Sequence, residues 1–241
     1  MTDTSRTTAA IPSDGVAVVI GSSGAIGGAL LERLRADDRF EASHGFSRTS
    51  DPPVDLLDEA SIAAAAAAVE ERGGPLRLVI DATGFLHGDD HMPEKTWRHL
   101  DGERLARSFA INAIGPALLM KHFLPLLPRD GTAVFATLSA RVASIGENTV
   151  GGWYGYRASK AALNQLVRSA ANELARSRKE ALCVALHPGH VESGLSAPFG
   201  GGGQEARTPD AAASALLDLL ERLEPGDSGG FFDHTGASIP W

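Results

Sequence analysis

The feature that most constrains the fold is a glycine-rich turn between a wholly apolar segment and an amphipathic one. Residues 16–20 are apolar at every position, as expected of a strand buried on both faces of a sheet. After the turn, Ile26, Leu30 and Leu34 recur at four-residue spacing, which predicts a helix with one apolar stripe. Glycines let such a turn bring its backbone close to a pyrophosphate, whose charge is met by amide groups at the helix N-terminus. The turn predicts a dinucleotide site, although an ordinary strand-to-helix turn is the alternative. Its residues are Gly21, Ser23, Gly24, Ala25, Ile26 and Gly27.

The rest of the chain alternates short apolar runs with helical patterns. This alternation predicts an α/β fold with a doubly wound parallel sheet of the Rossmann type, in a single domain over residues 15–241. Further strands are expected at 42–46, 76–80, 132–137, 182–187 and 231–232, with another candidate near Pro53 and Val54. Helices are expected around the alanine run 63–68 and over 102–127, 156–178 and 209–223.

Charge and composition narrow the class of function. The formal net charge of -8 argues against a broad nucleic-acid surface and favours small-molecule chemistry. His87 and His91, with Asp89 and Asp90, suggest a metal, but we interpret them as a solvated turn and predict no metal site.

The ends and the single cysteine carry predictions about location. Residues 1–14 are polar and lack the apolar stretch of a secretory signal, so we expect a disordered tail. No window approaches the length and apolarity of a membrane span. Cys183 lies in an apolar run, where a buried thiol is expected. Together these features predict a cytoplasmic protein with no membrane partner.

The end of the second strand indicates which dinucleotide is bound. Sites for NAD usually carry an acidic residue there for the ribose 2′-hydroxyl, whereas NADP sites carry a nearby arginine. Here Ser47 and Arg48 stand at that point without an acid, and both can bind a 2′-phosphate. The prediction is NADP(H) in preference to NAD(H), and a solvated surface arginine is the alternative.

Two further segments are placed near the cofactor by the predicted topology. Asp55, with Leu56, either binds the adenine amino group or caps the helix that begins near Asp58, and both interpretations stay open. Ala82, Thr83 and Gly84 follow the strand at 76–80, so they should line the cleft at the carboxyl ends of the strands.

A tyrosine and a lysine supply candidate chemistry. Tyr156 and Lys160 open a helical pattern, and four-residue spacing puts both on one helix face. A phenol with a pKa near 10 is a poor acid-base catalyst at neutral pH, and an adjacent cation favours its phenolate. Such pairs are common on helices, so this pair indicates a catalytic site only in combination with the glycine turn upstream.

These motifs together resemble the short-chain dehydrogenase/reductase family, over nearly the whole chain from Val16 to Trp241. The family's Tyr-x-x-x-Lys is met by Tyr156 and Lys160, its Asn-x-x-Gly by residues 112–115, and its Pro-Gly turn by residues 188–189. Residues 151–156, 161–164 and 239–241 are similar to the carbonyl-reductase branch that includes the sniffer and C-factor proteins.

The resemblance implies a hydride transfer between a nicotinamide cofactor and a carbonyl or alcohol substrate. Tyr156 would donate a proton during reduction, Lys160 would lower the pKa of Tyr156 and bind the nicotinamide ribose, and Asn112 would hold a water beside Lys160. A homo-oligomer of two or four chains, formed on helices 102–127 and 156–178, is also implied. Cofactor contacts are implied for Asn112, Tyr156 and Lys160 as well, and further for Pro188, Gly189 and Val191.

This chain departs from the family in two places. The family's catalytic hydroxyl is the second serine of a pair, but here Ala140 follows Ser139. Ser139 and Ser144 are both candidates, and Ser139 is preferred if the strand has ended or bulged there. The glycine turn has Ala25 where the family has its middle glycine. Residues 198–203 resemble the family's substrate lid.

The competing class of function is a non-catalytic NADP-binding sensor or signalling protein that kept the fold. Ala140, in place of the second serine, favours it, while the intact pair of Tyr156 and Lys160 argues against it. The substrate and the direction of the reaction are not given by the sequence.

Overall fold

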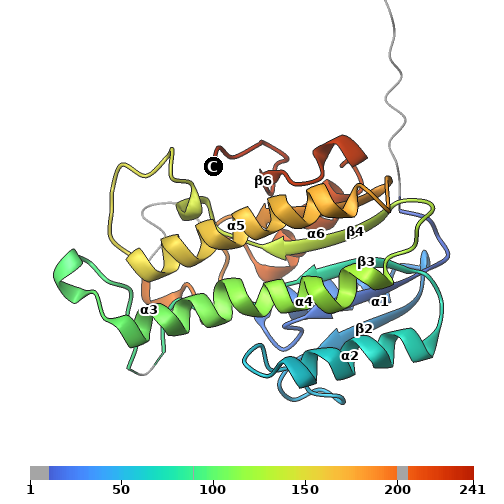
Figure 1. Cartoon of the computed structure of the whole chain (residues 1–241), viewed down its shortest axis with the longest axis horizontal. Helices are drawn as coiled ribbons and strands as arrows, with labels where there is room; N and C mark the ends of the chain where they lie inside the picture. The colour runs from blue at the N-terminus through green and yellow to red at the C-terminus, as the bar shows by residue number, and fades with distance from the viewer. Residues whose placement is uncertain (1–10, 89, 200–205) are drawn as a thin grey trace, which may run out of the picture.

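A computed structural model describes residues 11–88, 90–199 and 206–241. Six parallel strands form one sheet, in the order β2-β1-β3-β4-β5-β6 (Figure 1). The order reverses between β1 and β3, and such a switch point is where open α/β sheets bind their ligands. The predicted fold class, a single doubly wound domain, is therefore confirmed. The strands are β1 (Gly15–Ile20), β2 (Phe40–Phe46), β3 (Leu76–Asp81), β4 (Ala133–Leu138), β5 (Ala181–His187) and β6 (Phe231–Asp233).

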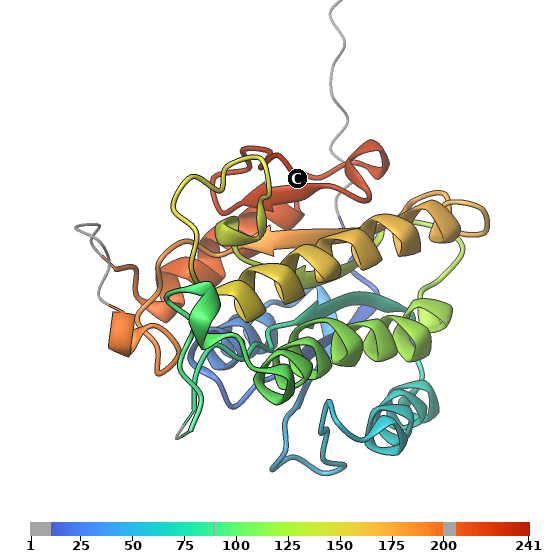
Figure 2. The same cartoon turned by 60° about the vertical axis from the view of Figure 1, so that its left-hand side comes forward.

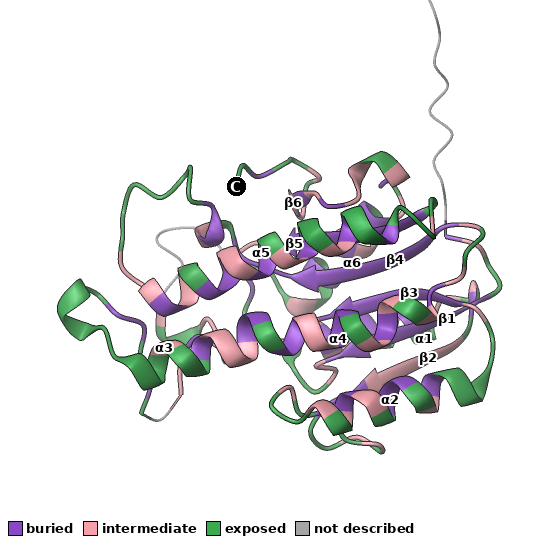
Figure 3. Ribbon diagram, viewed as in Figure 1, coloured by how far each residue is buried: buried purple, intermediate pink, exposed green. Residues whose placement is uncertain are grey.

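Helices cover both faces of the sheet, and the alternation of side chains along each strand decides which face each residue meets. On β4, Ala133 and Phe135 pack with one set of helices, whereas Val134, Ala136 and Leu138 pack with the other. The central strands are buried along their length (Figure 3). The first face is covered by α2 (Glu59–Arg72), α4 (Gly115–Phe123) and α5 (Tyr154–Leu174), and the second by α1 (Ala25–Arg35) and α6 (Pro209–Leu220).

The strand expected near Pro53 and Val54 is absent from the sheet, and that prediction is wrong. The segment between β2 and α2 is made of turns, and Val54 donates its N–H to the carbonyl of Ser47. Pro52 and Pro53 have no N–H to offer to a strand ladder, which explains why a sheet edge does not form here.

The helix expected over 102–127 is one continuous helical segment with a change of hydrogen bonding in its middle. It runs from α3 (Gly102–Phe109) through a π-helical turn (Ala110–Ile114) into α4, and ends in a 3-10 turn (Leu124–Leu126). Pro116 has no N–H to donate to the carbonyl four residues earlier, that of Asn112, and this accounts for the π turn.

The segment Gly102–Leu126 also corrects the expectation about membrane spans, because by length and composition it is apolar enough to cross a membrane. A helix that packs in a protein core passes the same test. The side chains of Leu119, Met120 and Phe123 on this segment lie in the core against the sheet.

Residues 11–14, which were expected to belong to a disordered tail, are part of the described structure. Ile11 is buried, and the carboxylate of Asp14 binds the guanidinium of Arg77 at 3.0 Å; residues 1–10 lie outside the described residues. Cys183 is buried on β5 as predicted, and burial raises the pKa of its thiol to about 12. Since all strands are parallel, the loops after β3, β4 and β5 gather at one end of the sheet (Figure 2).

Candidate active site

The glycine turn joins β1 to α1 with backbone atoms packed tightly against each other. Gly21 has a φ of 84°, a conformation that favours glycine. A Cβ on Gly27 would lie 2.2 Å from the carbonyl oxygen of Gly21, so this position too needs glycine. Gly24 caps α1, and the helix begins at Ala25, whose methyl group the turn accommodates. The turn thus presents main-chain groups at a helix N-terminus, as an anionic ligand requires.

A cleft of about 470 Å³ opens beside this turn, and we call it the glycine-turn cleft. It reaches from the turn to the end of β2, where Arg48 is exposed and makes no hydrogen bond or ion pair within the described part of the chain. Ser47 is buried, and its hydroxyl lies 3.1 Å from that of Thr49. Ten of the predicted cofactor residues line the glycine-turn cleft: Gly21, Ser23, Gly24, Ser47, Arg48, Asp55, Leu56, Ala82, Thr83 and Gly84.

The alternatives left open for Asp55 are reduced by the geometry of α2. The helix is capped by Asp58, whose carboxylate accepts the N–H of Ala60 at 3.0 Å. The carboxylate of Asp55 accepts the N–H of Leu57 at 3.0 Å, in a local turn before the helix. Asp55 is therefore not the helix cap.

Leu56 explains the glycine of the Asn-x-x-Gly motif. A Cβ on Gly115 would lie 2.7 Å from the Cβ of Leu56. Because Gly115 has no side chain, Leu56 can approach α4 and line the glycine-turn cleft.

A second cleft of about 310 Å³, the tyrosine cleft, brings the two halves of the predicted site together. It is bounded on one side by the glycine turn and on the other by Tyr156 and Lys160 at the start of α5. The residues along it that were predicted from sequence are Gly24, Ala25, Ile26, Gly27, Ala82, Thr83, Gly84, Ser139, Tyr156, Lys160 and Pro188.

Burial acts in opposite directions on the two central ionisable groups. It raises the pKa of Tyr156 to about 12 and lowers the pKa of Lys160 to about 8, while Asp81 opposes the second shift. The Lys160 ammonium donates to the carbonyl of Leu138 at 2.7 Å. Asp81 is fully buried and accepts hydrogen bonds from the hydroxyls of Thr83 and Thr137. Lys160 is therefore a buried cation near neutral pH, beside a phenol that holds its proton.

Ser139 follows β4 directly and turns its hydroxyl toward α5. The strand ends at Leu138, but Ser139 keeps the alternation of Ala133 and Phe135, whose side chains face the same helix. Its hydroxyl donates to the Asn164 side-chain oxygen at 2.7 Å. Ser139 also lines the tyrosine cleft, whereas Ser144 accepts the N–H of Glu147 at 3.1 Å and lies outside that cleft.

Sequence reasoning missed Asn164 as a site residue. It is buried on α5, and it stands four residues after Lys160 and eight after Tyr156, so all three share one helix face. That spacing was the available signal. Ser193 was also missed; it lines the tyrosine cleft together with Tyr156, and no motif used above includes it.

Asn112 lies in the π-helical turn, and its side chain is engaged by Phe85 and Ser159. Its amide accepts the N–H of Phe85 at 2.8 Å and donates to the carbonyl of Phe85 at 2.7 Å. It also donates to the hydroxyl of Ser159 at 3.1 Å. The Asn112 side chain thus fixes the loop after β3 against α5, and it does not line the tyrosine cleft.

A third cavity of about 390 Å³, the outer pocket, adjoins the tyrosine cleft and shares Ile26, Ser139, Tyr156 and Pro188 with it. Trp153 and Phe199 line it and pack edge-on against each other, with ring centroids 5.0 Å apart. His187 lines it too, and burial lowers the pKa of His187 to about 4, so the ring is neutral at pH 7. Gly189 and Val191 belong to this pocket. Of the predicted lid, residues 200–203 lie outside the described residues.

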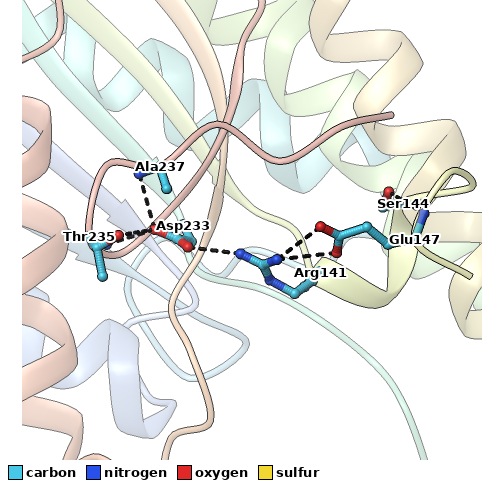
Figure 4. A network of polar contacts seen from close by, with 6 residues as sticks. All are labelled: Arg141, Ser144, Glu147, Asp233, Thr235 and Ala237. Carbon is cyan, nitrogen blue, oxygen red and sulfur yellow. Dashed lines mark hydrogen bonds and ion pairs between the residues drawn. The ribbon is translucent and has the colours of Figure 1, made fainter.

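The loop that carries Ser139 is fixed to the C-terminal segment by Arg141 (Figure 4). The guanidinium of Arg141 binds Glu147 on its own loop at 3.0 Å and Asp233, at the end of β6, at 2.8 Å. Asp233 also accepts hydrogen bonds from Thr235 and from the N–H of Ala237. One wall of the outer pocket is held in place by these contacts.

The histidine-rich segment after β3 is not the solvated turn that was predicted. His91 is buried, and its ring packs edge-on against Phe85 with centroids 4.8 Å apart. Residue 89 lies outside the described residues. Among the residues that the structure describes, no group of three or more potential ligands could hold a metal ion.

Comparisons with known proteins agree with this geometry. A family described as enoyl-(acyl carrier protein) reductase matches residues 29–220. The chain is 38% identical to the C-signal protein of Myxococcus xanthus over 144 residues, which are 59% of this chain and 81% of that protein. It is 33% identical to 1-hydroxy-2-glutathionyl-2-methyl-3-butene dehydrogenase of Rhodococcus sp. (strain AD45) over 193 residues, 80% of each chain.

Among solved structures, NADPH-bound carbonyl reductase from chicken fatty liver superposes with a TM-score of 0.80 at 28% identity, over 94% of each chain. Carbonyl reductase Sniffer of D. melanogaster, at 21% identity, has the same fold with a TM-score of 0.80, over 94% of this chain and 99% of that one. The family match, the relatives and the glycine turn joined to Tyr156 and Lys160 lead to one conclusion: the chain belongs to the short-chain dehydrogenase/reductase family.

Proposed function

We propose that the protein is an NADP(H)-dependent oxidoreductase that interconverts a carbonyl compound and an alcohol. The observation that carries the proposal is the tyrosine cleft, in which Tyr156, Lys160 and Ser139 lie along one cavity with the glycine turn. A dinucleotide laid along the glycine-turn cleft would extend into it, since Gly24, Thr83 and Gly84 line both. The NADPH-bound carbonyl reductase with the same fold supports this choice of cofactor.

The residues present fit such a cofactor from end to end. The close approach of Gly21 and Gly27 leaves main-chain amides free of side chains at the N-terminus of α1, where a pyrophosphate binds. Arg48 would receive the 2′-phosphate, with Ser47, and Asp55 would bind the adenine amino group. Pro188 on the tyrosine cleft, with Gly189 and Val191 on the adjoining outer pocket, would contact the nicotinamide end.

The proposed chemistry places the substrate carbonyl between the tyrosine cleft and the outer pocket. The nicotinamide ring of a bound cofactor would supply a hydride to the substrate carbon or accept one from it. In reduction, Tyr156 donates its phenolic proton to the carbonyl oxygen, and the Lys160 ammonium stabilises the phenolate that remains. Ser139 would bind the same oxygen by turning its hydroxyl proton from Asn164 to that oxygen. Asn112 would hold a water through its main chain, because its side chain is engaged by Phe85 and Ser159.

NADPH consumption across a panel of aldehydes and ketones tests the proposal. We expect a decrease in absorbance at the NADPH band with some members of the panel, and a slower one with NADH. Tight NADPH binding without consumption of cofactor by any member would contradict it.

A signalling function is the second candidate. The 38% identity with the C-signal protein and Ala140 in place of a second serine favour it. As a pure sensor, the protein would bind NADPH at the glycine-turn cleft, yet replacement of Tyr156 by Phe would leave its signalling output unchanged.

A further inference from the structure

The first turn of α5, which carries Tyr156, begins at a residue that offers its helix no cap. Trp153 stands at the cap position, and its indole can only donate a hydrogen bond, so it cannot accept from the free N–H groups of the turn. Its backbone has a φ of 52° and a ψ of 41°, the left-handed conformation that a bulky side chain rarely adopts. Gly151 and Gly152 before it also have positive φ values. Strained residues of this kind persist only where their surroundings hold them.

Glu94, from the loop between β3 and α3, supplies the missing cap from a distance of some sixty residues in the chain. Its main-chain carbonyl accepts the N–H of Trp153, and its carboxylate oxygen Oε2 accepts the N–H of Gly155 at 3.1 Å. The side chain is only 3% exposed. A carboxylate at a helix N-terminus also interacts favourably with the helix dipole.

The fit between Glu94 and this turn is close. A Cβ on Gly155 would lie 3.0 Å from the second carboxylate oxygen of Glu94, Oε1, and 3.1 Å from the hydroxyl of Ser108. Oε1 is buried and has no hydrogen-bond partner among the described residues. A side chain that is buried with half of its acceptors unpaired costs stability, and its place at the turn before Tyr156 suggests why that cost is tolerated.

Trp153 contacts two other residues that line the outer pocket. Its ring packs edge-on against Tyr156, with centroids 6.2 Å apart, and against Phe199 at 5.0 Å. His87 also packs against Phe199, with centroids 5.5 Å apart, and lies 3.0 Å from the carbonyl of Gly194. The orientation of the indole therefore sets the shape of the pocket beside the Tyr156 hydroxyl.

We infer that Glu94 is a positioning residue, which holds Trp153 in its left-handed conformation and so fixes the indole against Tyr156 and Phe199. The inference rests on the proposed function for its kinetic consequence. Its structural content is independent of any substrate. Arg157 assists by donating to the carbonyl of Gly152 at 3.1 Å, but its guanidinium has no acceptor for the N–H groups that Glu94 binds.

The test compares Glu94→Ala with Glu94→Gln in a protein that keeps Trp153 as its single tryptophan, through Trp97→Phe and Trp241→Phe. The amide oxygen of glutamine can still accept from Gly155. Glu180→Ala is the matched control, because Glu180 likewise accepts a main-chain N–H, that of Gly131 at 2.6 Å, at a site remote from the clefts. Quenching of Trp153 fluorescence by acrylamide reports the position of the indole without substrate.

Glu94→Ala should make Trp153 more accessible to acrylamide and lower kcat/KM for a carbonyl substrate roughly tenfold to a hundredfold, because reacting groups are misplaced. NADPH affinity should stay unchanged, and Glu94→Gln should restore both the quenching and kcat/KM. The inference would be overturned if Glu94→Ala gave the same acrylamide quenching and the same kcat/KM as Glu180→Ala. It would also be overturned if Glu94→Gln behaved like Glu94→Ala.

If Glu94→Ala fails to fold, Gly155→Ala decides. Its methyl group would press on Oε1 of Glu94 at a helical position where alanine is otherwise favourable. It should expose Trp153, and an unchanged quenching curve would overturn the inference. A wild-type protein that consumes no NADPH with any carbonyl would remove the proposed function, while the quenching result would still decide the role of Glu94.

Discussion

The glycine-turn cleft and the outer pocket both adjoin the tyrosine cleft, but they are built in different ways. The glycine-turn cleft is made from short stretches of chain at the ends of adjacent strands, and its shape follows from backbone contacts such as that of Gly27 with Gly21. The outer pocket is lined largely by the loops after β4 and β5, and side chains far apart in the sequence, such as Trp153 and Phe199, pack against each other in it. The glycine-turn cleft depends on particular residues at particular spacings in the sequence. The outer pocket depends on contacts between segments that are far apart in the sequence.

That difference explains how far sequence reasoning reached. The turn at 21–27 and the pair Tyr156 and Lys160 are recognisable because a few local spacings determine where they lie. The capping contact of Glu94 and the hydrogen bond between Ser139 and Asn164 join separate elements, so no local sequence pattern predicts them. The alternation of side chains along β4 does account for the direction of Ser139 once the strand is known to begin at Ala133.

The errors in the fold have a similar origin. Pro53 and Val54 look like a strand in a short window, but paired prolines cannot supply a ladder of N–H groups. His91 looks solvated among acidic neighbours, although tertiary packing against Phe85 buries it. Helix α5 begins at Tyr154, two residues earlier than its sequence pattern indicates, and Glu94 binds its first turn from another loop.

The largest effect is expected at Tyr156, which lines the outer pocket and the tyrosine cleft but not the glycine-turn cleft. Tyr156→Phe removes the proton donor and should lower turnover by about 10³-fold, in the range typical of general acid catalysis. NADPH binding should persist, because the glycine-turn cleft does not include Tyr156. Steady-state kinetics and a fluorescence titration with NADPH check both statements. Loss of cofactor binding in this variant would mean that the two regions are not separable.

Ser139→Ala tests the outer pocket, which Ser139 lines. Loss of a hydroxyl that binds the developing alkoxide should cost about 2 to 4 kcal/mol of transition-state stabilisation, or roughly a hundredfold or more in kcat. Ser144→Ala is the matched control and should be nearly silent, since Ser144 binds Glu147 outside the tyrosine cleft. The reverse pattern would transfer the role to Ser144. Full activity in both variants would leave the alkoxide to Tyr156 alone.

Arg48→Ala tests the cofactor side. The guanidinium is exposed at the glycine-turn cleft without a partner among the described residues, so its loss should leave the fold intact. The Kd for NADPH should rise about tenfold or more, as expected for a lost phosphate contact, and the Kd for NADH should change little. Equal effects on the two cofactors in a binding titration would contradict the assignment of Arg48 to the 2′-phosphate.

The smallest effect is a pH dependence that belongs to Lys160. Burial lowers the pKa of Lys160 to about 8, so its charge is present below that value and is lost as pH rises through it. Tyr156, with a pKa near 12, keeps its proton over this range. The rate of carbonyl reduction should therefore fall several-fold above about pH 8, as the cation that stabilises the phenolate disappears. Lys160→Met should be slow at every pH, and a step near pH 8 in that variant would assign the titration to another group.

Transfer of a labelled hydride tests the central claim most directly. The protein would be incubated with NADPH that carries deuterium at the transferable position of C4, together with a carbonyl substrate selected from the panel, and the product would be analysed by mass spectrometry and NMR. The account predicts one deuterium on the carbon of the newly formed alcohol, with no such product from Tyr156→Phe within the same time. Bound NADPH that transfers no deuterium to any carbonyl of the panel would contradict it.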